Sequence, residues 1–460
     1  MKKIIGLLCF FTSITVWSQD FWTEFSTAQP YTPTGVKSIS IVNNSTTWCN
    51  MACGNIGCTP IRRYAKTTNG GNSWTTQEID LGPDSNQLRI ANISGVSDLV
   101  AYAAVYPTTA NVLGGIWQTT DGGNTWQKQT SSAFSTPIYS YPNFVHFWDA
   151  NNGVAVGDPA NGYFEIYTTA DGGNNWSRVP MTNALVPLMD DEFGNENNFK
   201  IKGNSIWTFT TYGRILRSRD RGVSWEVFQS PLADFPCCFC DSNNKPDLAF
   251  TDENHGLIQS TDYQLFYTEN GGETWGILNW SGALRDFNIT DVPGLPNTYI
   301  SIGLDIEANI ERGSSYSIDA GNTWVSINNN PDLNYVDGGS IAMLHEDLGF
   351  AGGFSNSPTE GGIFRWGGGA MLRTAILANP AFAHKLSAQI SPNPTSGLLN
   401  ITGQNINKVE IRNLLGKIIT TTMSSSGHEC SVDLSNYAPG VYLVQVSSDQ
   451  ETSVYKVVKK

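Results

Sequence analysis

The sequence predicts an all-β fold, and three observations lead to this prediction. The 460 residues include 45 glycines and 14 tryptophans, a composition that suits short strands joined by tight turns. Hydrophobic residues make up 40% of the chain and charged residues only 15%, so the sequence has the material for a large core. A short motif ending in Trp recurs along the chain at a near-constant spacing, which indicates a repeat architecture.

The repeated motif reads Ser/Thr-x-Asp/Asn-x-Gly-x-Ser/Thr/Asn-Trp. Its tryptophans are 52, 50, 49, 50 and 49 residues apart. They are Trp74, Trp126, Trp176, Trp225, Trp275 and Trp324, and the Asp/Asn positions are Asn69, Asp121, Asp171, Asp220, Asn270 and Asp319. We expect each copy to form a tight hairpin turn, in which the Asp or Asn side chain accepts backbone N–H bonds and Gly adopts a positive φ. The Trp should then bury a large apolar area against a neighbouring unit, so we assign all twelve residues a structural role.

Each repeat has room for four short strands, the size of one propeller blade. Trp22 lies 52 residues before Trp74, where a strand after a motif should be. The segment 361–368 resembles the strand before a motif, but no motif follows it. Pairing the strand around Trp22 with the strand around Trp366 would remove an open sheet edge. The predicted fold of residues 19–368 is therefore a seven-bladed β-propeller whose N-terminal strand closes the last blade.

These motifs resemble the Asp-box (BNR) repeats of sialidases, sortilins, xyloglucanases and photosystem-assembly-factor-like propellers. The resemblance covers residues 20–368 and implies the propeller fold. It does not carry over sialidase activity, because that family needs an Arg-Ile-Pro motif and an arginine triad. The sequence has no Arg-Ile-Pro, and the 17 basic residues of the propeller are scattered. Xyloglucanases place their cleft between two propellers, and this chain has one.

The two ends of the chain carry export signals. Lys2 and Lys3 precede an apolar run that ends at Val16-Trp17-Ser18, so residues 1–18 are predicted to be a cleaved signal peptide. No later segment has 18 continuous apolar residues, so we expect no transmembrane segment. Residues 369–388 are interpreted as a linker.

Residues 389–460 are predicted to form a small antiparallel β-sandwich, because alternating apolar residues follow the Pro439-Gly440 turn. The segment contains SPNPTSG, NLLGK and APGVYLV and ends in lysine. These features resemble the type A sorting domain of the type IX secretion system of Bacteroidetes. The resemblance implies that residues 389–460 engage this machinery and that the protein is secreted or displayed on the outer-membrane surface.

The charge distribution argues against nucleic acid as a partner. The chain carries −14 in total; the signal peptide, linker and C-terminal domain contribute +2, +2 and +1, so residues 19–368 carry −19. A strongly acidic body repels nucleic acid and anionic membrane surfaces. We expect an extracellular glycan or protein ligand instead.

Candidate site residues come from the loops expected opposite the motif turns, the usual ligand face of a propeller. Asp158 follows the second strand of its blade, and the connection 183–198 brings Asp190, Asp191, Glu192 and Glu196 beside it. Asp158 with Asp191 or Glu192 would supply the two carboxyl groups of a glycosidase. Arg285 and Asp286 lie on a further loop of this face and would bind a polar group.

The cysteines form two clusters, Cys49, Cys53 and Cys58, and Cys237, Cys238 and Cys240. In an exported protein we expect local disulfides, for example Cys53–Cys58, although the sequence leaves the connectivity open. The spacings differ from those of zinc sites, and the histidines show no metal-ligand spacing. We expect no metal site and no cofactor.

Three functions remain open from the sequence. The first is a secreted, non-enzymatic propeller that binds a glycan or a protein. The second is a glycoside hydrolase that uses the carboxylates of the ligand face. The third is a structural component that attaches to the cell surface.

Overall fold

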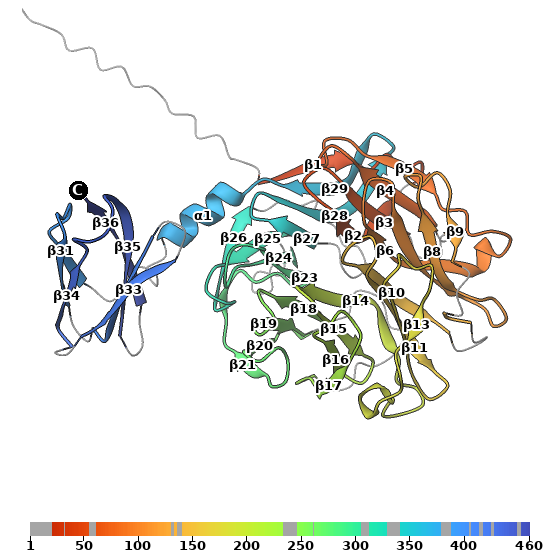
Figure 1. Cartoon of the computed structure of the whole chain (residues 1–460). Helices are drawn as coiled ribbons and strands as arrows, with labels where there is room; N and C mark the ends of the chain where they lie inside the picture. The colour runs from red at the N-terminus through yellow and green to blue at the C-terminus, as the bar shows by residue number, and fades with distance from the viewer. Residues whose placement is uncertain are drawn as a thin grey trace, which may run out of the picture. The chain divides into compact units, whose positions relative to one another are not determined.

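The computed structural model describes residues 21–460, except 32, 55–60, 130–132, 136–139, 233–245, 261, 305–311, 329–340, 379–387, 404–405, 414–416, 425–426 and 449–451. The chain divides into two compact units, Met1–Ala370 and Met371–Lys460. The described part of both is almost entirely β-structure (Figure 1). The predicted signal peptide, Cys58 and the cluster Cys237, Cys238 and Cys240 lie outside the described residues.

The larger unit is built from successive antiparallel groups of four strands, and the first and last of these groups are hydrogen-bonded to each other as one eight-stranded sheet. Its strands are, sheet by sheet, β2(Thr34–Ile41), β3(Thr47–Cys53), β4(Arg63–Thr67) and β5(Thr75–Glu78); β6(Leu88–Gly95), β7(Ala101–Pro107), β8(Gly115–Thr119) and β9(Gln127–Lys128); β10(Pro142–Phe147), β11(Gly153–Ala160), β12(Tyr163–Thr169) and β13(Ser177–Arg178); β14(Gly194–Lys202), β15(Ser205–Thr210), β16(Arg214–Ser218) and β17(Glu226–Gln229); β18(Asp247–Phe250), β19(Gly256–Gln259), β20(Leu265–Thr268) and β21(Gly276–Leu278); β23(Asn288–Asp291), β24(Tyr299–Leu304), β25(Arg312–Ser317) and β26(Thr323–Asn328); β27(Ile341–His345), β28(Leu348–Ser357), β29(Glu360–Trp366) and β1(Trp22–Ser26).

Three short elements lie in the connections: η1(Ser85–Gln87), η2(Asn183–Leu185) and β22(Ser281–Gly282), which pairs in parallel with β26.

The first strands of the sheets lie next to one another around a common centre. They are in contact in the cyclic order β2, β6, β10, β14, β18, β23 and β27, and β27 returns to β2. The N-terminal strand β1 pairs with β29, so that Trp22 lies opposite Trp366. This is the pairing expected from the spacing of Trp22. The sheets therefore follow one another in a ring, which is the arrangement of a β-propeller.

Apolar side chains between neighbouring sheets hold the ring together. One core cluster joins Trp48 and Tyr64 of the first sheet to Val105, Trp117 and Trp126 of the second. Equivalent clusters lie between the following sheets. Fully burying one large side chain contributes about 1.5–3 kcal/mol, so these clusters are the main stabilising contacts of the unit.

The six motif turns share one hydrogen-bond pattern, shown by Thr119–Trp126. The Thr119 Oγ1 donates to Asp121 Oδ1 at 2.9 Å and accepts from the Gly123 N–H at 2.8 Å. Asp121 Oδ1 also accepts the N–H of Thr125 at 2.9 Å. Gly123 adopts a φ of 95°, which side-chain-bearing residues rarely adopt. These bonds favour the ionised carboxylate and lower the pKa of Asp121.

Each motif turn is bonded to the turn between the first and second strands of its own sheet. The Gly70 N–H donates to the Ser45 carbonyl at 2.8 Å, and the Gly122 N–H donates to the Leu99 carbonyl at 2.9 Å. Corresponding bonds are found in the other four copies. The motif turns and the first-to-second turns therefore lie at the same end of the ring, here called the motif end. The opposite end, which carries the connections between sheets, is called the connection end.

The motif tryptophans are largely buried between sheets. Trp126 packs edge-on against Trp48 with ring centroids 6.3 Å apart, and Trp74 packs edge-on against Phe350 at 5.4 Å. Trp275 is the most exposed of the six and is only partly buried; its ring centroid lies 6.3 Å from that of Phe250.

The smaller unit consists of two antiparallel sheets. One has the order β30-β31-β34 and the other β33-β32-β35-β36. Their bounds are β30(Ala388–Ser391), β31(Leu398–Gly403), β32(Lys408–Arg412), β33(Ile418–Met423), β34(Glu429–Asp433), β35(Gly440–Ser447) and β36(Thr452–Lys459). Residues of both sheets, including Leu399, Ile401, Val409 and Val444, share one buried core.

The helix α1(Gly369–Ala378) occupies the first half of the segment interpreted as a linker. Among the described residues, no helix has the length and apolar character needed to cross a membrane. Cys49 and Cys430 are buried free thiols. Cys53 is disulfide-bonded, and its partner lies outside the described residues, so the Cys53–Cys58 pairing stays a prediction.

Candidate functional site

Asp158 lies at a bulge of β11, near the connection end of the ring. Its Oδ1 accepts hydrogen bonds from Asn143 Nδ2 and from the Gly194 N–H, both at 2.9 Å. Burial, together with the nearby charges of Glu196 and Glu165, raises the pKa of Asp158 to about 8 despite these bonds. Asp158 is therefore a protonated carboxyl group at neutral pH.

Glu192, one of the two predicted partners of Asp158, is fully buried in an ion pair. Its two carboxylate oxygens accept bonds from Arg214 Nε at 2.8 Å and Arg214 Nη2 at 2.7 Å. Thr210 Oγ1 donates to the same carboxylate at 2.5 Å, and the Leu188 N–H donates at 2.6 Å. The carboxylate is thus occupied by four donors inside the protein.

The other acids of the 183–198 connection point in different directions. Asp191 is exposed and accepts a bond from the Tyr212 hydroxyl at 2.7 Å. Asp190 is exposed as well. Glu196, in β14, forms an ion pair with Lys37 of β2. The charge of Glu196 raises the pKa of Asp158.

A polar cluster surrounds the Glu196–Lys37 ion pair near the connection end. Tyr106 and Tyr141 are stacked with ring centroids 4.3 Å apart. Burial raises the pKa of Tyr106 to about 12 and raises that of Tyr141 as well. The Lys37 ammonium lies 5.8 Å from the Tyr106 ring centroid. Both hydroxyls are therefore neutral at physiological pH.

Arg285 and Asp286, which the sequence predicts to bind a polar group, differ in exposure. Arg285 is fully buried, and its guanidinium donates to Ser315 Oγ and Ser326 Oγ, each at 3.0 Å. Asp286 is partly exposed and lies against Gly303, at a position that a Cβ would fill. Arg285 thus serves the packing of its own sheet.

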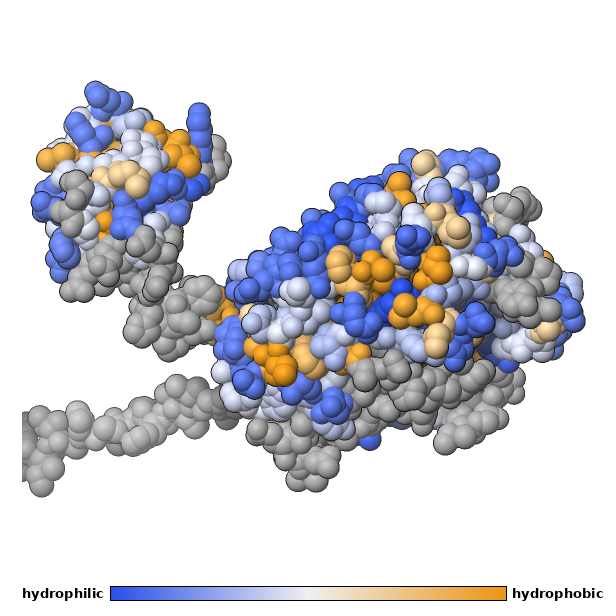
Figure 2. All heavy atoms as spheres, turned by 90° about the horizontal axis from the view of Figure 1, so that it is seen from below, coloured by the Kyte–Doolittle hydropathy of each residue, from blue (hydrophilic) through white to orange (hydrophobic). Residues whose placement is uncertain are grey.

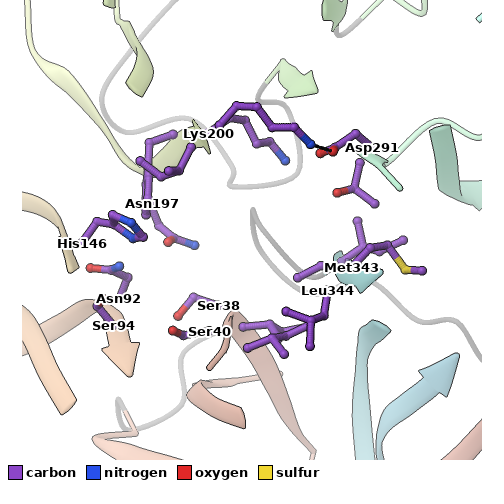
Figure 3. A pocket seen from close by; sticks show the side chains of 18 of the residues that line it. Ser38, Ser40, Asn92, Ser94, His146, Asn197, Lys200, Asp291, Met343 and Leu344 are labelled. Carbon is purple, nitrogen blue, oxygen red and sulfur yellow. Dashed lines mark hydrogen bonds and ion pairs between the residues drawn. The ribbon is translucent and has the colours of Figure 1, made fainter. Parts of the chain in front are cut away.

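A cavity of about 460 Å³ occupies the centre of the ring. Figure 3 shows polar side chains from several first strands pointing into it. Its lining includes Ser38, Ser40, Asn92, Ser94, His146, Asn197, Lys200, Lys202, Asp291, Met343 and Leu344. The lining also includes Gly203, which directly follows β14, and Pro293, two residues after the end of β23, so the cavity reaches the motif end.

The sequence analysis did not identify this cavity. A usable signal was present, because polar residues occur in i, i+2 pairs on the first strands: Ser38 and Ser40, Asn92 and Ser94, Lys200 and Lys202. Residues two apart share one side of a strand. The analysis placed the ligand site in loops of the connection end, whereas these pairs come from the strands themselves.

Exposed apolar side chains gather on the connection between β13 and β14. Met181, Leu188 and Met189 are 62%, 57% and 59% exposed. Val186 is also exposed, whereas Leu185 is fully buried and anchors the segment. Residues 181–189 are called the apolar loop below. Figure 2 shows one face of the molecule, on which hydrophobic residues also gather in patches between polar ones.

The ion pair between Arg214 and Glu192 fixes the backbone of the apolar loop. Arg214 Nη2 donates to the Val186 carbonyl at 3.0 Å, and Glu192 accepts the Leu188 N–H. The Arg214–Glu192 pair thus holds the backbone on both sides of Pro187, while the neighbouring apolar side chains face solvent.

Residues 389–460 match the family model described as secretion system C-terminal sorting domain. This confirms the assignment of the C-terminal segment, and the chain carries a type IX secretion sorting domain. No curated protein matches the sequence.

Several solved structures resemble the chain. The structure of YCF48 bound to D1 peptide has a TM-score of 0.50 and 18% identity, covering 76% of this chain and 96% of that one. YCF48 from Cyanidioschyzon merolae has a TM-score of 0.49 and 16% identity, covering 76% and 99%. PorZ, a surface component of the type IX secretion system of Porphyromonas gingivalis, has a TM-score of 0.43 and 14% identity, covering 92% and 59%. The first of these matches shows a shared β-propeller fold.

Proposed function

We propose that this protein is a non-enzymatic binding module, exported by the type IX system, whose seven-bladed propeller docks an extracellular polypeptide through the apolar loop. The N-terminal strand β1 completes the last blade of this propeller. The observation that carries the proposal is the apolar loop itself, in which three large apolar side chains are more than half exposed.

Exposed apolar side chains on a rigid loop favour the binding of a partner. Their exposure costs solvation free energy that burial against a partner would recover, at about 25 cal/mol per Å². The Glu192–Arg214 pair fixes the loop backbone before binding, which reduces the entropy lost on association. A preorganised loop of this kind suits a protein-binding surface.

The charge next to the loop selects the chemistry of the partner. Asp190 and Asp191 directly follow Met189 and are exposed, and residues 19–368 carry −19. An apolar surface bordered by carboxylates is complementary to a segment that combines apolar and basic residues. The YCF48 structure contains a bound peptide, which supports peptide binding as a use of this fold.

A second candidate function is glycoside hydrolysis, and one observation favours it. Asp158 is protonated at neutral pH, as a general acid must be, and Glu196 lies close enough to influence it. Against this function, Glu196 is paired with Lys37, and Glu192 is paired with Arg214. The non-enzymatic function is therefore the better supported of the two.

Both functions are tested with the full secreted chain on one panel. Immobilised polysaccharides and synthetic peptides are incubated with the wild-type protein and with Asp158→Asn, and retention and reducing-end release are recorded together. Retention of the protein on immobilised peptides, without release of reducing ends from the polysaccharides, supports the proposal. Release of reducing ends that is lost in Asp158→Asn would establish the hydrolase and overturn it.

A further inference from the structure

The central cavity has the composition of a carbohydrate site. Hydroxyl and amide groups line it from three directions, with Ser38 and Ser40 on β2, Asn92 on β6 and Asn197 on β14 (Figure 3). Met343 and Leu344 of β27 add an apolar side. Its volume of about 460 Å³ lies within the range of small-molecule sites.

The charges in the cavity are balanced. Lys202 forms an ion pair with Asp291, and Lys200 lies 3.1 Å from the Asp247 carboxylate. Lys200 also donates to the Ile289 carbonyl at 3.3 Å. Burial lowers the pKa of His146 to about 4, so this lining residue adds no charge at neutral pH. The balance favours neither an anion nor a cation.

A lysine–aspartate pair offers donors and acceptors side by side. The Lys202 ammonium has three N–H donors, and the Asp291 carboxylate accepts only. Neighbouring hydroxyls of a sugar each donate and accept, so they match such a pair, and bonds to charged groups are the stronger kind. The apolar side formed by Met343 and Leu344 suits the C–H face of a sugar ring.

One polar group in the cavity is left without a partner. Ser38 is 5% exposed, and its Oγ has no hydrogen bond among the described residues. Figure 3 shows Ser38 among the side chains that line the cavity, on the same side as Asn92 and Ser94. A buried hydroxyl without a partner is unfavourable, and a hydrogen bond to a ligand hydroxyl would offset this cost.

We propose that the central cavity is a binding site for a neutral sugar unit, entered from the motif end. The site is separate from the apolar loop, since β14 begins next to the loop and carries Lys200 and Lys202 at its other end. The inference therefore goes beyond the proposed function, and either can fail without the other.

The test uses the full chain and isothermal titration with named sugars. The neutral probes are cellobiose, maltose, mannobiose and lactose, and digalacturonate and chitosan dimer are the charged probes. We expect at least one neutral disaccharide to bind with a Kd at or below about 1 mM. No binding of any neutral probe at about 10 mM would overturn the proposal, as would binding of the charged probes alone.

Paired variants locate the site. Lys202→Met with Asp291→Leu removes the ion pair without leaving an unpaired buried charge, and should weaken sugar binding at least about tenfold. Arg221→Met with Asp149→Leu removes another ion pair, an exposed one at the motif end, and should leave binding within about twofold. Circular dichroism of both variants checks that the fold is retained. Equal weakening in both would overturn the assignment to the cavity.

Discussion

The carboxylate of Glu192 accepts two hydrogen bonds from the guanidinium of Arg214, at 2.8 and 2.7 Å, beneath the apolar loop. Such a bidentate pair is rigid, and both of its partners are buried. A residue that the sequence presents as a candidate catalytic acid therefore holds a surface loop in place. This relationship links the fold of the fourth sheet to the proposed binding surface.

Glu192→Ala should destabilise the propeller by about 3–5 kcal/mol, because it leaves the Arg214 charge buried without its partner. Thermal unfolding monitored by tryptophan fluorescence measures the effect. The double variant Glu192→Leu/Arg214→Met removes both charges and should recover most of the loss. A melting temperature unchanged in Glu192→Ala would show that the pair does not hold the loop.

Trp126→Ala should lower stability by about 3–5 kcal/mol, because the ring fills the space between the first and second sheets beside Trp48. Val325→Ala is the control, since Val325 is exposed. Chemical unfolding in urea compares the two variants. Equal stability of Trp126→Ala and the control would contradict the structural role of the motif tryptophans.

Deleting residues 19–26 should remove β1 and expose the edge of β29. Trp22 packs against Trp366 with ring centroids 5.0 Å apart and donates to Ser314 Oγ at 2.9 Å. We expect a melting temperature lower by several degrees and self-association through the free edge, because unpaired strand edges recruit other strands. Light scattering and calorimetry measure both. A monomer with wild-type stability would contradict closure by β1.

Asp158 should make the propeller less stable as the pH rises. Its pKa of about 8 in the folded protein exceeds the unfolded value near 4, so the folded state binds the proton more tightly. The resulting stabilisation is complete below about pH 4 and is lost as the pH rises through about 8. The difference in melting temperature between wild type and Asp158→Asn should therefore change between pH 5 and pH 9, in favour of the variant. A constant difference would show that Asp158 has an ordinary pKa.

The regular part of the fold was predictable because it depends on local chemistry. Residues equivalent to Asp121, Gly123 and Trp126 recur at a fixed spacing because each motif turn needs the same hydrogen bonds. The pairing of Trp22 with Trp366 followed from the same spacing, although the two residues are far apart in sequence. The C-terminal sorting domain was recognisable because its signals are likewise short, local motifs.

The roles of the candidate site residues could not be predicted, because they depend on partners distant in sequence. The partner of Glu192 is Arg214, and the partner of Glu196 is Lys37, which belongs to the first sheet. The sequence shows acids on one connection but not which of them are neutralised. The central cavity was missed because its lining is distributed over several repeats.

The most direct test of the binding function is the affinity of the full chain for peptides that alternate leucine with lysine, compared with peptides that alternate leucine with aspartate. We predict that the lysine peptides bind at least about tenfold more tightly, and that Leu188→Ser/Met189→Ser abolishes this advantage. The control variant Ile277→Ser/Val325→Ser, which changes exposed apolar residues of other sheets, should retain it. Equal binding of both peptides, or equal loss in both variants, would contradict a docking role for the apolar loop.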